Sequence, residues 1–240
     1  MTAPSAAEHV CIALDFASRD EVLAAARHFG GRVGWLKIGL EAFVAAGPAL
    51  VEEAARTGSR VFLDLKFHDI PATVAGAVAS AARSGAAMVN VHASGGRAML
   101  EAARDAAARA GLPKLIAVTL LTSLDARALA DLPMAGNPEG IARRLALLAQ
   151  ACGLAGVVCA AADLPGIRSA CGPDFFTVVP GIRPAGADAA DQKRIATPAA
   201  AMQAGADLLV IGRPITAAPD PDAALAGILA EVERAAPDHR

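Results

Sequence analysis

An apolar run that ends in three charged residues is the part of the sequence best suited to chemistry. The run Val61–Ile70 reads Val-Phe-Leu-Asp-Leu-Lys-Phe-His-Asp-Ile, and Pro71 then turns the chain toward a helix. Side chains alternate faces along a strand, so Asp64 and Lys66 are expected to project the same way, with Asp69 just beyond the strand. A buried carboxylate and ammonium carry a desolvation cost that pairing must offset. A single buried ion pair is the alternative, but the placement favours a functional site.

The composition indicates a single globular domain and argues against a nucleic-acid-binding protein. The chain has 240 residues, of which 55% are hydrophobic and 19% charged, and its net charge is −2. This length and apolar content predict one domain over residues 1–240 with a sizeable core. The small net charge and the 3% aromatic content, with no Tyr, argue against a nucleic-acid partner.

Neither the cysteines, the histidines nor the apolar segments predict a metal site or a membrane span. The four cysteines lack C-x-x-C spacing and the five histidines lack H-x-x-x-H spacing, so we expect core thiols in a reducing compartment and no metal. We expect no signal peptide, because residues 1–8 lack a basic region followed by an apolar run. Residues 145–162 carry no charge, but Gln150, Gly153 and Gly156 favour a helix end, a turn and a buried strand over a membrane span. We therefore predict a cytoplasmic protein with no membrane partner.

Short apolar runs alternate with Ala-rich helical patterns along the whole chain. Strands are predicted at Val10–Leu14, Gly34–Ile38, Arg60–Leu65, Met88–His92, Lys114–Thr119, Gly156–Cys159, Phe175–Val179 and Asp207–Ile211. Helices are predicted near residues 19–29, 41–57, 72–84, 96–110, 138–152, 163–171, 197–204 and 221–235. Eight β/α units predict the α/β class and a closed (β/α)8 TIM barrel. An open doubly wound sheet is the alternative, but no G-x-G-x-x-G follows a strand.

Charged and polar residues gather at the predicted carboxyl ends of these strands, where barrel enzymes build their active sites. They are Asp15, Lys37, Asp64, Lys66, Asp69, Asn90, His92, Thr122, Ser123, Pro180, Arg183 and Arg213. Lys37 could pair with Asp15 merely to close the barrel end, but five charges at three successive strand ends favour a catalytic cluster. Two long connections, residues 121–138 and 181–197, are rich in Gly, Pro and Asp, as functional loops often are.

The loops after the seventh and eighth strands predict a phosphate site. In many barrels these loops bind phosphate through backbone N–H groups and a helix N-terminus. Here they contain Gly181, Arg183, Gly212 and Arg213. Glycine lets the backbone approach an oxyanion, and Arg presents a fixed fork of donors. The alternative is that Arg213 is an ordinary surface arginine.

These motifs together resemble a known enzyme family. They are Asp64-Leu-Lys-Phe-His-Asp69-Ile-Pro-x-Thr73, Leu121-Thr-Ser123, Pro180-Gly-Ile-Arg183, Asp191-Gln192 and Ile211-Gly-Arg-Pro-Ile-Thr216. The set closely resembles the bacterial orotidine 5′-monophosphate decarboxylases, from Asp15 to Asp222. The resemblance implies conversion of orotidine 5′-monophosphate (OMP) into uridine 5′-monophosphate (UMP) and CO₂ without a cofactor or metal. This is the last step of de novo pyrimidine nucleotide synthesis.

The resemblance also implies residue roles. Lys37, Asp64, Lys66 and Asp69 would form an alternating charge network. The implied substrate-binding residues are Asp15, Lys37, Asp64, Ile70, Thr73, Thr122, Ser123, Pro180, Arg183, Gln192, Gly212 and Arg213. Among these, Asp15 and Lys37 would hold the ribose, the Thr-Ser pair the pyrimidine edge, and the two arginines with Gln192 and Gly212 the phosphate. Asp69, Ile70 and Thr73 would reach the partner's site across a homodimer.

The implied chemistry accounts for the residue types. Loss of CO₂ leaves negative charge in the plane of C6, where the ring delocalises it poorly. An ammonium at C6, here Lys66, stabilises that charge and supplies the proton. Flanking carboxylates keep the ammonium charged and positioned. Repulsion between Asp64 and the substrate carboxylate is a further contribution to which we give less weight.

Two other functions remain open on the sequence. Sugar-phosphate decarboxylases and synthases on the same barrel share the D-x-K-x-x-D core and use Mg²⁺, but they resemble one another in carrying a carboxylate on strand two, where this chain has Lys37. A barrel that binds a phosphate compound without catalysis would be expected to lack the proton donor, whereas Lys66 is present.

Overall fold

Eight parallel strands close into a barrel in sequence order. The computed structural model describes residues 5–132, 134–184 and 195–235. The strands are β1 (Val10–Ala13), β2 (Trp35–Gly39), β3 (Arg60–Phe67), β4 (Met88–His92), β5 (Lys114–Val118), β6 (Gly156–Val158), β7 (Phe176–Val179) and β8 (Leu208–Ile211). Each strand pairs in parallel with the next, and β8 pairs with β1. The (β/α)8 barrel is therefore confirmed, and the open doubly wound sheet is excluded.

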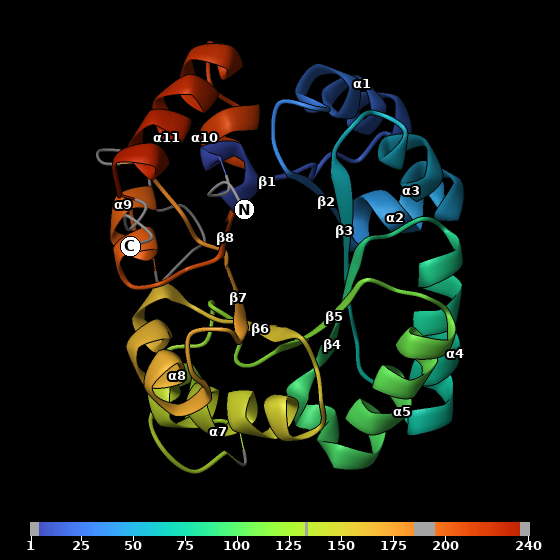
Figure 1. Cartoon of the computed structure of the whole chain (residues 1–240), viewed down its shortest axis with the longest axis vertical. Coiled ribbons are helices and arrows are strands. Elements are labelled where there is room, and N and C mark those ends of the chain that lie inside the picture. The colour runs from blue at the N-terminus through green and yellow to red at the C-terminus, as the bar shows by residue number, and fades with distance from the viewer. Residues whose placement is uncertain (1–4, 133, 185–194, 236–240) are drawn as a thin grey trace.

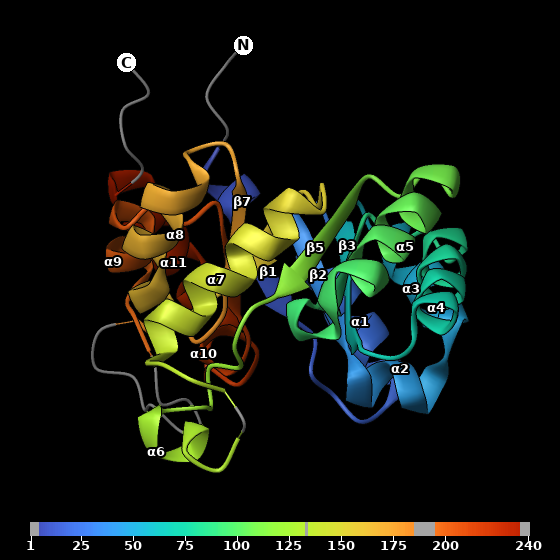
Figure 2. The ribbon, with the colours of Figure 1, turned by 90° about the horizontal axis from the view of Figure 1, so that it is seen from below.

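Helices form a ring outside the barrel (Figure 1). They are α1 (Arg19–Phe29), α2 (Leu40–Ala46), α3 (Pro48–Ala55), α4 (Pro71–Arg83), α5 (Gly96–Arg109), α6 (Ala126–Leu129), α7 (Pro138–Ala151), α8 (Leu164–Cys171), α9 (Pro198–Gln203), α10 (Arg213–Thr216) and α11 (Pro221–Ala235). Short 3₁₀ turns at Ala6–His9, Ala93–Gly95 and Ala161–Asp163 complete the described elements. In Figure 2, α6 extends beyond the barrel on the side where the strands end.

The hydrophobic core has two parts because strand residues alternate between two buried faces. Residues such as Ile12, Leu36 and Leu63 point outward and pack against the helices. Residues such as Cys11 and Phe62 point inward and fill the barrel. Both faces of the strands are apolar, so a charged side chain inside the barrel needs a partner.

The predicted helix over residues 41–57 is wrong as a single element. The structure has two helices, because Gly47 adopts a left-handed conformation with φ 68° that ends α2. Pro48 then begins α3, where its missing N–H costs no hydrogen bond. The short helices α6 and α10 lie in connections that the sequence pattern left without helices.

Strand β3 carries an irregularity at the charged residues. Its pairing with β4 shifts between Leu63, which opposes Val89, and Phe67, which opposes Val91. Within the described residues, Lys66 is the one non-glycine with a positive φ, at 52°. The prediction that Asp64 and Lys66 project the same way is confirmed, since both line one cavity, but the register shift and the positive φ of Lys66 were not predicted.

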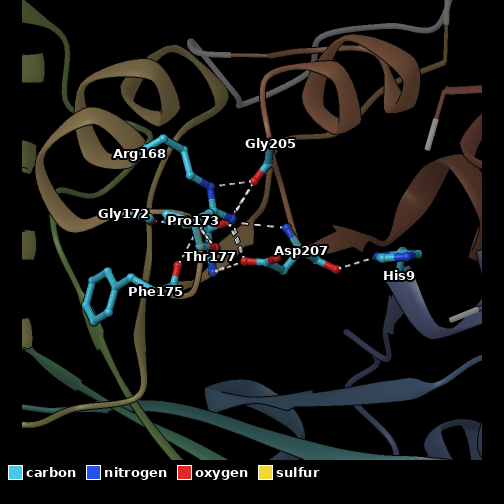
Figure 3. A network of polar contacts seen from close by, with 8 residues as sticks. All are labelled: His9, Arg168, Gly172, Pro173, Phe175, Thr177, Gly205 and Asp207. Atoms are coloured by element: carbon cyan, nitrogen blue, oxygen red, sulfur yellow. Dashed lines mark hydrogen bonds and ion pairs between the residues drawn. The ribbon is translucent and has the colours of Figure 1, made fainter. Parts of the chain in front are cut away.

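The amino-terminal end of the barrel is held by a polar network around Arg168 of α8 (Figure 3). The Arg168 guanidinium lies 2.6 Å from the Asp207 carboxylate and donates to the carbonyls of Gly205 and Phe175 and to the hydroxyl of Thr177. These residues sit where β7 and β8 begin, the end of such barrels that serves stability.

The apolar stretch at residues 145–162 forms the end of α7, a turn and β6, as predicted. Within the described part of the chain, no helix is long and apolar enough to cross a membrane. Cys11, Cys152 and Cys159 are buried and Cys171 is half-buried against the core, which confirms the prediction that the thiols are core residues.

Candidate active site

A cavity of about 490 Å³ opens at the carboxyl ends of the strands. Its lining combines inward apolar residues of the barrel with charged residues from the strand ends. The lining residues are Ala13, Asp15, Lys37, Glu41, Phe62, Asp64, Lys66, Val118, Leu120, Leu121, Thr122, Val158, Pro180, Gly181, Arg183, Val210, Gly212, Arg213 and Thr216. The cavity therefore lies where the sequence predicted the site.

Charges of alternating sign run along one wall of this cavity. The Lys37 Nζ lies 2.8 Å from Asp15 Oδ1 and 3.5 Å from Asp64 Oδ2. The other oxygen of Asp64 lies 2.7 Å from the Lys66 Nζ. Four side chains from three neighbouring strand ends thus form a continuous chain, acid–base–acid–base, and Lys66 is its end.

Lys37 is buried, yet it remains an ammonium. Burial by itself would lower the pKa of Lys37, but attraction to Asp64 and Asp15 and the hydrogen bond to Asp15 outweigh it. The pKa of Lys37 therefore lies above its ordinary value. Lys37 serves as a fixed positive charge in the cavity wall.

Asp64 remains ionised for the same reason. Burial by itself would raise the pKa of Asp64, but the positive charges of Lys37 and Lys66 and hydrogen bonds from Lys66 and Asn90 outweigh it. The pKa of Asp64 consequently lies below its ordinary value. Asp64 thus presents a carboxylate to the Lys66 Nζ at 2.7 Å.

Gly39 at the end of β2 leaves room for the first ion pair. A Cβ at this position would lie 3.0 Å from the Lys37 Nζ and 3.1 Å from Asp15 Oδ1. A Cβ would require the Lys37 Nζ and the Asp15 carboxylate to shift by a few tenths of an ångström, so Gly leaves this ion pair undisturbed.

Two residues at the end of β4 were noted on the sequence without a role. Asn90 is fully buried and its Nδ2 donates to Asp64 Oδ1 at 2.7 Å. The His92 ring centroid lies 5.3 Å from that of His68. Burial, followed by repulsion from His68 and Lys66, holds the pKa of His92 below its ordinary value. No pattern in the sequence signals the Asn90 contact, because it joins positions 26 residues apart.

The loops after β7 and β8 carry the residues expected to bind phosphate. Pro180, Gly181 and Arg183 follow β7, and Gly212 and Arg213 follow β8. Arg183 is buried, and its Nη1 donates to the Ile182 carbonyl at 2.9 Å. Asp191 and Gln192 lie outside the described residues. Two arginines and two glycines on one wall make it suited to an oxyanion.

The loop after β5 contributes only in part as expected. Thr122 lines the cavity, whereas Ser123 is not among the lining residues. Leu120 and Glu41, which no sequence motif indicated, also line the cavity, as does Thr216 at the end of the last motif. An apolar wall next to a threonine hydroxyl suits a flat ring with polar edges.

Asp69, Ile70 and Thr73 are not brought into the cavity of their own chain. All three are exposed, and Ile70 is 66% exposed. The Asp69 carboxylate accepts a hydrogen bond from the Ile70 N–H at 2.6 Å. In a single chain, these side chains are separate from the cavity lining.

Metal-ligating side chains do not gather in the described part of the chain. No three His, Cys, Asp or Glu residues there lie close enough to hold a metal ion. In the cavity, the carboxylates of Asp15 and Asp64 face Lys37 instead.

The chain is similar to a known protein family over most of its length. A family model described as "Orotidine 5'-phosphate decarboxylase / HUMPS family" matches residues 8–228. The chain belongs to this family. The matched region of the orotidine 5'-phosphate decarboxylase / HUMPS family runs from before β1 into α11, and so includes all eight strands.

Individual relatives and solved structures agree with this assignment. The chain is 53% identical over 226 residues to "Orotidine 5'-phosphate decarboxylase" of Sodalis glossinidius, covering 93% of this chain and 90% of the relative. A protein of the same name from Halorhodospira halophila is 54% identical over 225 residues, covering 93% of this chain and 95% of that relative. The crystal structure of orotidine 5'-phosphate decarboxylase from Lactobacillus acidophilus is similar with a TM-score of 0.83 at 34% identity, covering 94% of this chain and 99% of that one.

Proposed function

We propose that this protein decarboxylates OMP to UMP and CO₂, the last step of de novo pyrimidine nucleotide synthesis. The observation that carries the proposal is the chain Asp15–Lys37–Asp64–Lys66 in a cavity that Arg183 and Arg213, from the loops after β7 and β8, also line. Membership of the orotidine 5'-phosphate decarboxylase / HUMPS family supports it independently.

In the proposed reaction, the bond from C6 to the carboxyl carbon breaks and its electron pair stays on C6. The Lys66 ammonium stabilises that charge, because it is held beside the reacting carbon by Asp64 rather than recruited from solvent. Lys66 then transfers its proton to C6, which gives UMP, and regains a proton from water. Lys37 and Asp64 keep the charges fixed before the reaction begins, so little reorganisation is needed.

Substrate recognition divides the cavity in two. Asp15 and Lys37 would bind the ribose hydroxyls, and Thr122, with Ser123 after it, the pyrimidine edge. In the loops after β7 and β8, Pro180, Arg183, Gly212 and Arg213, joined by Gln192, would bind the phosphate. Because the phosphate lies far from C6, its binding energy can position the ring and close the site.

We also propose a homodimer in which Asp69, Ile70 and Thr73 complete the partner's cavity. Their exposure supports this, because side chains that reach a partner's cavity must be exposed in the single chain, and Ile70 is 66% exposed. Leu40 and Val44 of α2 add further exposed apolar surface, 54% and 81%. In the dimer, Asp69 would extend the alternating charges beyond Lys66.

The proposal also includes the domain organisation, cofactor use and localisation that the sequence predicts. Residues 1–240 form one catalytic domain, the reaction uses neither metal nor cofactor, and the enzyme acts in the cytoplasm without a nucleic-acid or membrane partner. Support for one domain is the continuous core that the helices share outside the barrel.

A spectrophotometric assay of OMP consumption, with and without a chelator, tests the proposal. We expect rapid loss of OMP that a chelator leaves unchanged. Activity on a sugar phosphate that a chelator abolishes would instead favour metal-assisted enolate chemistry. Binding of UMP with no turnover of OMP would favour a non-catalytic barrel.

A further inference from the structure

The β3–β4 ladder has a gap at the catalytic lysine. Leu63 opposes Val89 and Phe67 opposes Val91, so the three residues Asp64–Lys66 lie opposite the single residue Asn90. In a regular parallel ladder, backbone groups of the neighbouring strand would bind the N–H groups of this segment. Where the ladder is interrupted, a buried N–H needs another acceptor.

Asn90 supplies that acceptor from its side chain. Its Oδ1 accepts a hydrogen bond from the backbone N–H of Lys66 at 2.8 Å. Its Nδ2 donates to Asp64 Oδ1 at 2.7 Å, the same oxygen that the Lys66 Nζ contacts at 2.7 Å. One fully buried amide therefore binds both the backbone of one charged residue and the side chain of the other.

The chemistry of the two partners fixes the orientation of the amide. A backbone N–H can only donate and an ionised carboxylate can only accept, so the position needs an acceptor and a donor on one short side chain. Asn meets this requirement. An Asp at position 90 would keep the acceptor for the Lys66 N–H but would face Asp64 with a second negative charge.

The backbone at Lys66 also needs such support. Its φ of 52° lies in the left-handed region, which costs free energy for a residue with a side chain. Strained backbone persists where the surroundings hold it in place, and it is concentrated at functional sites. Here the strained residue is the one that carries the reacting ammonium.

We propose that Asn90 is a positioning residue that locks the left-handed backbone of Lys66 and fixes the Asp64 carboxylate against the Lys66 ammonium. This inference rests on the proposed function, since the geometry that Asn90 holds is the one that would present the ammonium to C6. Asn90 does not line the cavity, so it acts through its two neighbours and not on the substrate.

Several charged groups surround Asp64, and Asn90 is the neutral one among its hydrogen-bond donors. Lys37 faces Asp64 from β2 and Lys66 from β3, while His92 at the end of β4 is coupled to both Asp64 and Lys66. Loss of the Nδ2 donor removes one interaction that favours the carboxylate. As the pH falls, activity that depends on an ionised Asp64 would then be lost at a higher pH than in the wild-type protein.

The test compares Asn90→Asp and Asn90→Ala with Thr177→Val as a matched control. Thr177 is equally buried and hydrogen-bonded, but it belongs to the Arg168 network at the other end of the barrel. We expect both Asn90 variants to lower kcat for OMP about 10²-fold while KM changes less than about threefold. In Asn90→Asp, the acid side of the kcat profile should also move to higher pH. Thr177→Val should keep the wild-type kcat and profile.

Crystal structures of the variants provide a readout that does not depend on turnover. In Asn90→Ala, Lys66 should leave the left-handed region or its Nζ should leave Asp64; in Asn90→Asp, the Lys66 backbone should stay and the Asp64 carboxylate should turn away. Wild-type kcat and pH profile in either folded variant would overturn the inference, as would unchanged Lys66 and Asp64 geometry in Asn90→Asp. If wild-type protein does not consume OMP, the proposed function fails, and these structures still decide what Asn90 holds.

Discussion

Asp64 contacts both lysines of the cavity wall, so its ionisation connects the site with the stability of the barrel. Its pKa lies below the ordinary value of 3.8 because, although burial opposes it, Lys37 and Lys66 favour the carboxylate. Near and below this pH the unfolded chain binds the proton more readily than the folded one, so stability falls as pH falls through this range.

The expected result is that Asp64→Asn destabilises the protein at pH 7, by about 3 kcal/mol, because it removes one partner of a buried charge network. The difference from wild type should be constant above pH 5 or so and should shrink as pH falls below the ordinary pKa of Asp. Urea unfolding of both proteins between pH 3 and 7 checks this. A difference that grows toward acid would show that Asp64 is not ionised in the folded protein.

At the residue scale, the sequence predicted the members of the site better than their contacts. Asp64 and Lys66 were predictable because charges at the end of an apolar strand need partners. The hydrogen bonds of Asn90 were not, because they depend on a register shift between two strands. Neither was the role of Gly39, which follows from the space that the Lys37–Asp15 pair occupies.

At the scale of elements, the amino and carboxyl ends of the strands serve different purposes. The Arg168 network joins α8 to the starts of β7 and β8, whereas the cavity lies at the other ends of the strands. Periodicity predicted the strands and most helices, but not the break at Gly47 or the short helices α6 and α10. A helix of one turn leaves almost no periodic signal, and its formation depends on the loops packed around it.

Arg168→Ala is expected to destabilise the fold by about 2 kcal/mol or more, because several carbonyls and the Asp207 carboxylate lose a charged donor. The kcat of the folded variant should equal that of wild type, since the network is far from the cavity. Urea unfolding and steady-state kinetics on the same preparation check both parts. A fall in kcat without a fall in stability would contradict this division between the ends of the barrel.

If the loops after β7 and β8 bind the phosphate, loss of Arg213 should affect turnover of the nucleotide much more than turnover of the nucleoside. Arg213→Ala should lower kcat/KM for OMP about 10²-fold or more, because it removes a charged phosphate contact. Orotidine, which lacks the phosphate, should react slowly in both proteins and should barely sense the change. Kinetics with both substrates decides the matter: an equal reduction for the two would mean that Arg213 supports structure, and the phosphate assignment after β8 would be abandoned.

At the scale of the whole molecule, the proposed dimer makes each site depend on two chains. Lys66→Ala and Asp69→Ala should each be inactive alone. After subunit exchange, heterodimers should regain activity, because one of their two sites contains both Lys66 and the partner's Asp69. Mixing labelled variants and following exchange and turnover together provides the check. Exchange without recovered activity would assign Asp69 to the site of its own chain.

The proposed role of Lys66 is to stabilise and protonate C6 as CO₂ leaves. Turnover of OMP in D₂O by wild-type protein and by Lys66→Ala tests this role. Wild type should release CO₂ and give UMP with deuterium at C6, because the exchangeable ammonium carries deuterium. Lys66→Ala should show the thermal unfolding transition of a folded protein. Its kcat should fall about 10³-fold or more, because the donor and the stabilising charge are removed together. Retention of roughly a tenth of wild-type kcat with deuterium at C6 would assign the proton donor to another group and rule out this role for Lys66.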